Sequence, residues 1–195
     1  DRPGEVTKHD VLLREWEIVQ TAKEGVGNCW PLVPNPKPAN PTLDDEQRKA
    51  LDGLLVSTNL VSVFRGGAGT GKSFVLHELV RHIQQSGRPV AVLAPQRQQV
   101  VEMEKAGFPS PATLASFVTK AELPARSVVV VDEAGQIGGR QMLALLRLAK
   151  ERNARVVLAG DTRQHGAVEA SDALLAIERH AGVRAVELHK IRRQD

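Results

Sequence analysis

Residues Gly66–Ser73 read GGAGTGKS and match the pattern G-x-x-x-x-G-K-[ST]. The apolar run Leu60–Phe64 precedes them, and a helical pattern from Ser73 to Gln85 follows. A strand, a glycine-rich turn and a helix in this order indicate a phosphate-binding loop, in which backbone N–H groups surround phosphate oxygens and the helix N-terminus adds its positive dipole. The alternative is a glycine-rich turn that matches by chance, but it leaves the strand, the helix and the Lys-Ser pair unexplained.

The residues of this loop have separate predicted roles. Lys72 places a positive charge against the β- and γ-phosphates of a nucleotide, and the Ser73 hydroxyl binds Mg²⁺. The loop residues predicted to bind the nucleotide are Gly67, Ala68, Gly69, Thr70, Gly71, Lys72 and Ser73.

A second apolar run, Val128–Val131, ends in the carboxylates Asp132 and Glu133. Ligands of open α/β sheets bind at the carboxyl ends of the strands, where both side chains are expected. We predict that Asp132 holds the Mg²⁺ shell and that Glu133 polarises the water that attacks the γ-phosphate. An acidic pair after a strand is by itself more often a solvated turn, but the phosphate loop earlier in the chain favours the functional interpretation.

The segment Gly160–Gln164, GDTRQ, follows the next apolar run. Its neutral amide, Gln164, is placed to contact a γ-phosphate or the attacking water. Two alternatives remain for its neighbours, with Asp161 as a helix cap and Arg163 as a surface cation. The chain has no N-K-x-D-like segment, which disfavours a guanine-specific switch protein.

Apolar runs alternate with helical patterns from about residue 60 onward. Such alternation predicts an α/β fold with a mainly parallel sheet covered by helices on both faces. The predicted strands are Leu60–Phe64, Val90–Leu93, Val128–Val131, Val156–Ala159 and Arg184–Leu188. The predicted helices are Ser73–Gln85, one from about Gln96, Gly139–Glu151 and Asp172–His180.

Two further segments precede this pattern. Thr7, three residues before Asp10, predicts the start of a helix that ends near Gly25. Its apolar residues recur at helical spacing and are Leu12, Trp16 and Val19. Five of the eleven prolines then fall within residues 31–41, which predicts an extended strap because proline discourages both helix and strand. The expected division is a helical prefix 1–30, a Pro-rich linker 31–41, a motor domain 42–188 and a link 189–195.

The composition disfavours several classes of protein. Of the 195 residues, 42% are hydrophobic and 25% are charged, which is typical of a globular domain and not of a disordered or collagen-like chain. No apolar stretch is long enough to cross a membrane, and the start at Asp1 has no signal-peptide character, so we expect a cytoplasmic fragment without a membrane partner. The single cysteine, Cys29, fits a reducing compartment. Aromatic residues are scarce at 3%, which limits stacking on nucleic-acid bases, and the net charge of +3 is ordinary.

The motifs form an ordered series of Gln47, GGAGTGKS, the strand ending Ala94-Pro95, residues 113–117, VVVVDEAG, GDTRQ and IRRQ. Over about residues 42–195 this series resembles the first RecA-like motor domain of a superfamily 1 helicase of the RecD-like branch. GDTRQHGAVEASDALL and LHKIRRQ are similar in particular to the helicase part of conjugative relaxase-helicases. The resemblance implies ATP and Mg²⁺ as cofactors, 5′ to 3′ movement on single-stranded DNA, and a second RecA-like domain in the same polypeptide.

The resemblance also assigns roles residue by residue. Gln47 matches the adenine-reading glutamine, Gln164 the γ-phosphate sensor, and Arg193 the arginine that stabilises transition-state charge. The implied catalytic set is Lys72, Glu133, Gln164 and Arg193. Two alternatives stay open. Gln47, three residues after Asp44, can complete a helix capping box, and Arg193 can belong to a solvated basic tail in which Arg192 is the competing arginine.

For DNA, the resemblance points to the loop after the second strand and to residues 113–117. Gln96 stands where the family usually has Thr, and its amide can still donate to a phosphate oxygen. Phe117 is a candidate base-stacking face, with burial beside Leu114 as the alternative. The implied DNA-binding residues are Pro95, Gln96, Arg97, Thr113, Ser116, Phe117 and His165.

The leading hypothesis is an ATP-dependent DNA helicase module. We expect an upstream relaxase domain as a further partner. The fragment is expected to be inactive without its second RecA-like domain. A RecD-like repair or recombination helicase shares every motif quoted. A P-loop module that binds DNA or a partner without hydrolysis is the alternative from another class.

Overall fold

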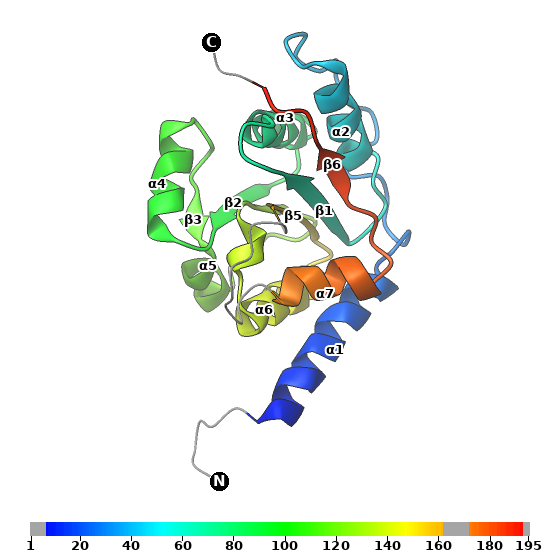
Figure 1. Ribbon diagram of the computed structural model, residues 1–195, viewed down its shortest axis with the longest axis vertical. Coiled ribbons are helices and arrows are strands. Elements are labelled where there is room, and N and C mark those ends of the chain that lie inside the picture. Colours follow the sequence, from blue (N-terminus) through cyan, green and yellow to red (C-terminus); the bar gives the residue numbers. More distant parts are fainter. Residues whose placement is uncertain (1–6, 162–171, 193–195) are drawn as a thin grey trace.

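The computed structural model describes residues 7–161 and 172–192 and shows a layered α/β fold (Figure 1). The helices are α1 (Lys8–Glu24), α2 (Asp45–Leu55), α3 (Lys72–Gln85), α4 (Arg97–Lys105), α5 (Leu114–Lys120), the 3₁₀ helix η1 (Ala134–Gln136), α6 (Gly139–Glu151) and α7 (Asp172–His180). The strands are β1 (Val61–Gly66), β2 (Val90–Ala94), β3 (Ala112–Thr113), β4 (Val128–Val131), β5 (Arg155–Gly160) and β6 (Val186–Leu188).

The strands form one sheet in the order β3-β2-β4-β5-β1-β6, and all its pairs are parallel. The parallel arrangement predicted from the sequence is therefore confirmed. Because the strands are parallel, their carboxyl ends meet at one edge. The loop after β1 thus lies at the same edge as the ends of β4 and β5.

Both faces of the sheet are covered, so strand residues alternate between two cores. Val129 and Val131 of β4 pack with α1, α5, α6 and α7 on one face, whereas Val128 and Val130 pack with α2, α3 and α4 on the other. Figure 1 shows α2 and α3 on one side of the sheet and α6, α7 and α1 on the opposite side. This double burial explains the uninterrupted apolar runs in the sequence.

The first helix begins and ends where the sequence predicts. Thr7 and Asp10 form the capping box, and Gly25 is the C-cap residue. The side chains that anchor the helix are Ile18 and Ala22, which lie in the core, whereas Leu12 and Trp16 are 64% and 62% exposed. The helix packs against α6 and α7 (Figure 1).

The proline-rich segment 31–41 contains no helix or strand, as its composition predicts. The N–H groups of Leu32 and Val33 donate to Ser57 O and Leu55 O, at 3.1 and 2.9 Å. Farther along, His82 Nε2 of α3 lies 3.0 Å from Lys37 O. These contacts hold the segment against the end of α2 and against α3. Within the described part of the chain, no helix is long and apolar enough to cross a membrane.

Candidate nucleotide-binding site

The phosphate loop connects the end of β1 to the start of α3. Helix α3 begins at Lys72, one residue before the predicted start at Ser73. Its backbone requires glycine at Gly69 and Gly71, which have φ values of 75° and 79°. Thr70 closes the turn because its Oγ1 donates to Gly67 O at 2.7 Å. A Cβ at Gly66 would lie 2.8 Å from that same Oγ1, so only glycine leaves the turn undisturbed.

Lys72 is held by the acidic pair that follows β4. Its Nζ donates to Asp132 Oδ1 at 2.8 Å and lies 3.6 Å from Glu133 Oε1. The side chains of Lys72 and Asp132 are 10% and 17% exposed, whereas that of Glu133 is 42% exposed. The structure thus brings the three predicted charged groups together and leaves Glu133 the most accessible to water.

The acidic turn has an unusual backbone. Glu133 has a φ of 52°, and its N–H donates to Asp132 Oδ1 at 2.9 Å. Non-glycine residues in this left-handed region are uncommon and concentrate at functional sites. The turn is supported from below by Gly160, where an added Cβ would lie 3.4 Å from the backbone nitrogens of Ala134 and Gly135.

A cavity of about 440 Å³ opens between the phosphate loop and the acidic turn. The lining residues include Gly67, Lys72, Ser73, Glu133 and Asp161. The sequence alone suggested only a helix cap for Asp161. Its place after β5, the strand beside β1, is the signal that locates it at this site.

The residues around the cavity fit a nucleotide with Mg²⁺. The glycine-rich turn presents backbone N–H groups at the N-terminus of a 14-residue helix, and Lys72 adds a cation. Among the described residues, no group of three or more His, Cys, Asp or Glu side chains could hold a metal by itself. Ser73 and Asp132 would supply protein oxygens to Mg²⁺, which usually takes its remaining ligands from substrate phosphates and water.

Gln47 lies beside the loop and completes a capping box. Its N–H donates to Asp44 Oδ1 at 3.0 Å, and Asp44 N–H donates to Gln47 Oε1 at 3.1 Å. The residue is 5% exposed, and its Nε2 occupies the space that a Cβ on Gly71 would need. The capping interpretation is confirmed. The position of Nε2 beside Gly71 also places Gln47 against the phosphate loop.

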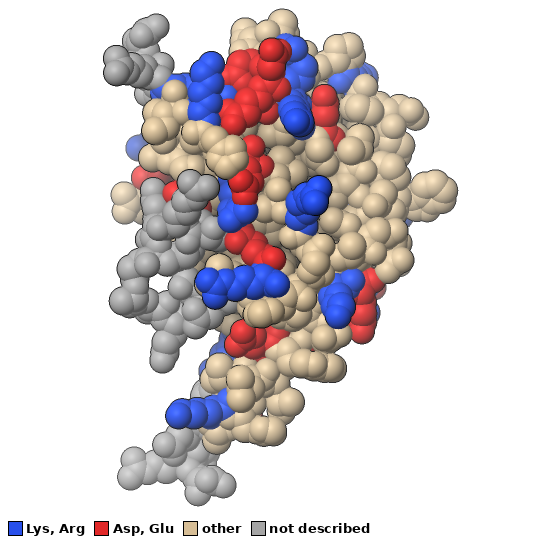
Figure 2. Space-filling view, turned by 45° about the vertical axis from the view of Figure 1, so that its right-hand side comes forward, with Lys and Arg blue, Asp and Glu red and all other residues tan. Residues whose placement is uncertain are grey.

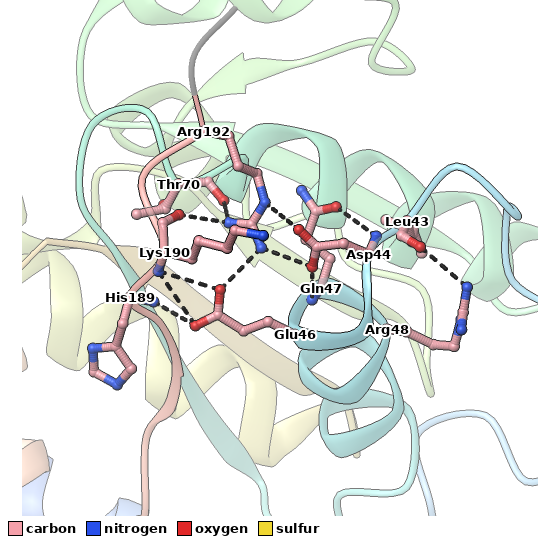
Figure 3. Close-up of polar contacts among 9 residues, drawn as sticks. All are labelled: Leu43, Asp44, Glu46, Gln47, Arg48, Thr70, His189, Lys190 and Arg192. Atoms are coloured by element: carbon pink, nitrogen blue, oxygen red, sulfur yellow. Dashed lines mark hydrogen bonds and ion pairs between the residues drawn. The ribbon is translucent and has the colours of Figure 1, made fainter.

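Asp44, Glu46 and Arg192 form a cluster on the outer side of the loop, which we call the clasp (Figure 3). Arg192 Nε and Nη2 donate to the two carboxylate oxygens of Asp44 at 2.5 and 2.8 Å, and Nη2 also donates to Glu46 Oε2 at 2.9 Å. Hydrogen bonds from Arg192 and from Gln47 N–H lower the pKa of Asp44 to about 2. Bonds from His189 N–H and from Arg192 likewise lower the pKa of Glu46.

The sequence-based prediction missed the clasp, although two signals pointed to it. An acidic run of Asp44, Asp45 and Glu46 opens α2, and a basic run begins at His189. Figure 2 shows acidic side chains gathered between basic ones near the top of the molecule, at the end where α2 begins. Three predicted site residues, Gln164, His165 and Arg193, lie outside the described residues.

The described residues implied in DNA binding lie at or just after the carboxyl ends of β2 and β3. Gln96 and Arg97 are exposed, and Pro95 is half-buried. Gln96 Nε2 donates to Gln136 Oε1 at 3.1 Å, and Gln99 Nε2 donates to the same oxygen at 2.9 Å. Gln136 belongs to η1, directly after the acidic turn, so this loop contacts the nucleotide-site segment.

The 113–117 segment combines local capping with partial burial. Thr113 Oγ1 accepts the N–H of Ser116 at 3.3 Å at the start of α5. Ser116 is exposed, whereas Phe117 is half-buried and packs against the core that contains the fully buried Leu114. Phe117 is therefore only partly accessible to a base.

A larger cavity of about 900 Å³ lies at the opposite, amino edge of the sheet. Arg155, which is 4% exposed, donates there to the carbonyls of Ser57, Asn59 and Trp30, and Arg88 donates to Leu32 O and Arg126 O. Desolvation lowers the pKa of both guanidinium groups. Their bonds to main-chain carbonyls hold loops in place, far from the phosphate loop.

Comparison with known proteins bears on this geometry. The family described as "AAA domain" matches residues 42–195. The chain belongs to this AAA domain family. The chain is 29% identical over 157 residues to the probable conjugal transfer protein TraA of Sinorhizobium fredii (strain NBRC 101917 / NGR234), in an alignment that covers 78% of the chain and 14% of TraA. It is also 29% identical over 181 residues to the ATP-dependent RecD2 DNA helicase of Deinococcus radiodurans, which covers 88% of the chain and 24% of RecD2.

The chain thus spans less than a quarter of the length of either relative. The resemblance to RecD-like and conjugative helicase parts is confirmed as a distant similarity. Among solved structures, AMPPCP-bound DnaA from Aquifex aeolicus aligns with 19% identity and a TM-score of 0.42, over 95% of the chain and 48% of DnaA.

Proposed function

We propose that this AAA domain binds ATP with Mg²⁺ and hydrolyses it as the first of two RecA-like motor domains of a DNA helicase. The observation that carries the proposal is the meeting of Lys72, Asp132 and Glu133 beside the phosphate-loop cavity. A cation for the phosphates, a carboxylate for the metal and a water-accessible carboxylate for proton transfer are the groups that ATP hydrolysis needs.

The phosphate loop and Lys72 bind the phosphates in this proposal. Lys72 Nζ exchanges its bond to Asp132 for phosphate oxygens, which frees the Asp132 carboxylate. Ser73 and Asp132 would hold Mg²⁺, which supplies positive charge against the phosphates when it is bound. Gln47, packed on Gly71, is proposed to read the adenine base, as the resemblance implies.

Glu133 is the proposed general base. Its carboxylate is the most exposed of the three charged side chains and lies 3.6 Å from Lys72 Nζ. A carboxylate in this place accepts a proton from the attacking water. Gln164 and Arg193 are proposed to sense the γ-phosphate and to stabilise the transition-state charge.

Single-stranded DNA is the proposed polymer partner, with 5′ to 3′ movement. The Gln96–Gln136 hydrogen bond supports coupling to the nucleotide, because Gln136 N–H donates to Glu133 O at 3.0 Å. A DNA phosphate that binds Gln96 would therefore affect the position of the turn that carries Glu133, the proposed general base. This proposed surface also includes Pro95, Arg97, Thr113, Ser116 and Phe117, and His165 is assigned to it from the resemblance alone.

We further propose that residues 42–188 form the motor domain and that residues 189–195 lead to its RecA-like partner. Residues 1–30 and 31–41 are the proposed prefix and linker, although Ile18 and Ala22 pack into the motor core. The similarity to the probable conjugal transfer protein TraA favours a conjugative helicase. We propose that it is a cytoplasmic relaxase-helicase with a relaxase domain upstream.

The test is ATP hydrolysis by the full-length protein with and without single-stranded DNA. We expect hydrolysis that DNA accelerates, and Lys72→Ala should abolish nucleotide binding whereas Lys105→Ala, on the exposed end of α4, should not. Hydrolysis that DNA leaves unchanged contradicts the motor function.

A RecD-like repair helicase is the second candidate, because similarity to RecD2 covers more of the chain. Site-specific nicking of DNA by the full-length protein would assign it to the conjugative class, and its absence to the repair class. Nucleotide binding without any turnover would favour a module that only binds.

A further inference from the structure

The segment His189–Arg192 lies along the outer side of the phosphate loop. Arg192 N–H donates to Gly69 O at 2.6 Å, and Arg192 Nη1 donates to Thr70 O. Ile191 and Arg192 also pack over Gly69, where an added Cβ would lie 3.4 Å from Ile191 Cγ2. Two consecutive carbonyls of the loop are therefore held by one residue from the far end of the chain.

The clasp joins this segment to α2 as well. The guanidinium of Arg192 makes five hydrogen bonds, to Asp44 twice and to Glu46, Thr70 O and Lys190 O once each. Glu46 also accepts the N–H of His189 at 2.7 Å. Arginine has five N–H donors in a planar fork, so every donor is used here, and the three donors of a lysine could not replace them.

The contact with Thr70 O determines how the loop presents its backbone. All described peptide bonds are trans, and in a trans peptide the C=O and the next N–H point in opposite directions. Because Thr70 O faces Arg192, the N–H of Gly71 faces away from Arg192. Gly71 lines the cavity, so the clasp fixes the orientation of a donor that a phosphate can use.

The charges of the clasp restrain its geometry. One guanidinium faces two carboxylates, and the side chains of Arg192, Asp44 and Glu46 are 19%, 34% and 28% exposed. Partly buried bidentate pairs of this kind have defined geometry as well as attraction. The cluster can therefore transmit a displacement of residues 189–192 to the loop.

We infer that Arg192 is a positioning residue that sets the conformation of the phosphate loop and couples it to the C-terminal segment. The inference rests on the proposed function for its effect on nucleotide affinity. The structural part, the restraint of the loop, can be measured without any nucleotide.

The test compares Arg192→Gln, Arg192→Lys and Asp44→Asn with wild type. Asn retains the side-chain oxygen that caps α2 but loses the charge that holds Arg192. Arg48→Gln is the matched control, because Arg48 is an arginine near Asp44 in α2 whose side chain, among the described residues, bonds to Leu43 O and the exposed Asp45 and not to the phosphate loop. Backbone amide exchange of residues 66–73 is measured without nucleotide, and the affinity for a fluorescent ATP analogue with Mg²⁺ is measured separately.

We expect amide exchange in the loop to rise about tenfold in Arg192→Gln, and nucleotide affinity to fall by a similar factor. Arg192→Lys should recover little of either, whereas Arg48→Gln should match wild type. A lower melting temperature with unchanged loop exchange and unchanged affinity assigns Arg192 a merely structural role and overturns the inference. If wild type binds no nucleotide, the proposed function fails, and loop exchange alone then decides the inference: a rise in Arg192→Gln upholds the restraint, and no change refutes it.

Discussion

Lys72 Nζ lies 2.8 Å from Asp132 Oδ1, although the two residues are 60 positions apart in the sequence. The phosphate-binding cation is thus paired with the carboxylate proposed to hold the metal. Nucleotide phosphates compete with Asp132 for Lys72, and Mg²⁺ offers Asp132 a replacement partner. The pair therefore makes binding of the nucleotide and binding of the metal depend on each other.

Asp132→Asn separates these two effects. Without the competing carboxylate, Lys72 is free for phosphate, so metal-free nucleotide should bind several-fold more tightly than to wild type. Nucleotide with Mg²⁺ should bind several-fold more weakly, because one metal ligand has lost its charge. Titrations of a fluorescent ATP analogue in EDTA and in Mg²⁺ measure both, with Asp52→Asn on the exposed face of α2 as the control. A change of the same sign under both conditions would contradict the exchange.

Glu133→Gln tests the assignment of the base. The amide retains the size of the carboxylate but cannot accept a proton, so turnover should fall by about a hundredfold or more while nucleotide affinity is retained. Single-turnover hydrolysis by the full-length protein, beside equilibrium binding, makes the measurement. Turnover equal to wild type would remove Glu133 as the base.

Ile18→Ala tests whether α1 stabilises the motor domain. Ile18 is 1% exposed and lies in the core with α6 and α7, so its truncation should lower the free energy of unfolding by about 2–5 kcal/mol. Leu12→Ala on the same helix, where the side chain is 64% exposed, should change it by less than about 0.5 kcal/mol. Urea denaturation followed by circular dichroism gives both values. A loss for Ile18→Ala as small as that for Leu12→Ala would show that α1 does not stabilise the motor domain.

Motifs and periodicity predicted the sheet, the phosphate loop and the acidic pair because each is local in the sequence. Runs such as Val128–Val131 carry their own burial pattern, and the loop requires glycines at fixed spacing. Contacts between distant segments left no such pattern. Helical spacing singled out Leu12 and Trp16, which are exposed, and not Ile18, which is buried. The acidic run at residue 44 and the basic run at residue 189 are visible in the sequence, but only the fold shows that they meet.

Gly71→Ala tests the contact between the phosphate loop and Gln47. Gly71 and Gly87 have similar φ values of 79° and 82°, so alanine costs each about 1 kcal/mol in backbone conformation. At Gly71 the new Cβ would also clash with Gln47 Nε2, whereas at Gly87 nothing lies within 4 Å. Gly71→Ala should therefore destabilise the protein by at least about 1 kcal/mol more than Gly87→Ala. Nucleotide binding should weaken in Gly71→Ala and stay unchanged in Gly87→Ala. Urea denaturation and nucleotide titration check this, and equal losses would exclude the contact.

The clasp makes stability depend on pH in acid. Hydrogen bonds from Arg192 and Gln47 N–H, with Lys190 nearby, lower the pKa of Asp44 in the folded state from an ordinary 3.8 to about 2. A lowered folded-state pKa contributes stability that is fully present above the unfolded value and is lost as pH falls through the folded value. Wild type should therefore exceed Asp44→Asn in stability by a constant margin above about pH 5, and the margin should shrink between about pH 4 and pH 2. The Glu46 carboxylate also titrates in acid but is present in both proteins, so the difference reports chiefly on Asp44. Urea midpoints measured at intervals from pH 7 to pH 2 test this, and a margin that stays constant or widens in acid would show that the Arg192 bond does not lower the Asp44 pKa.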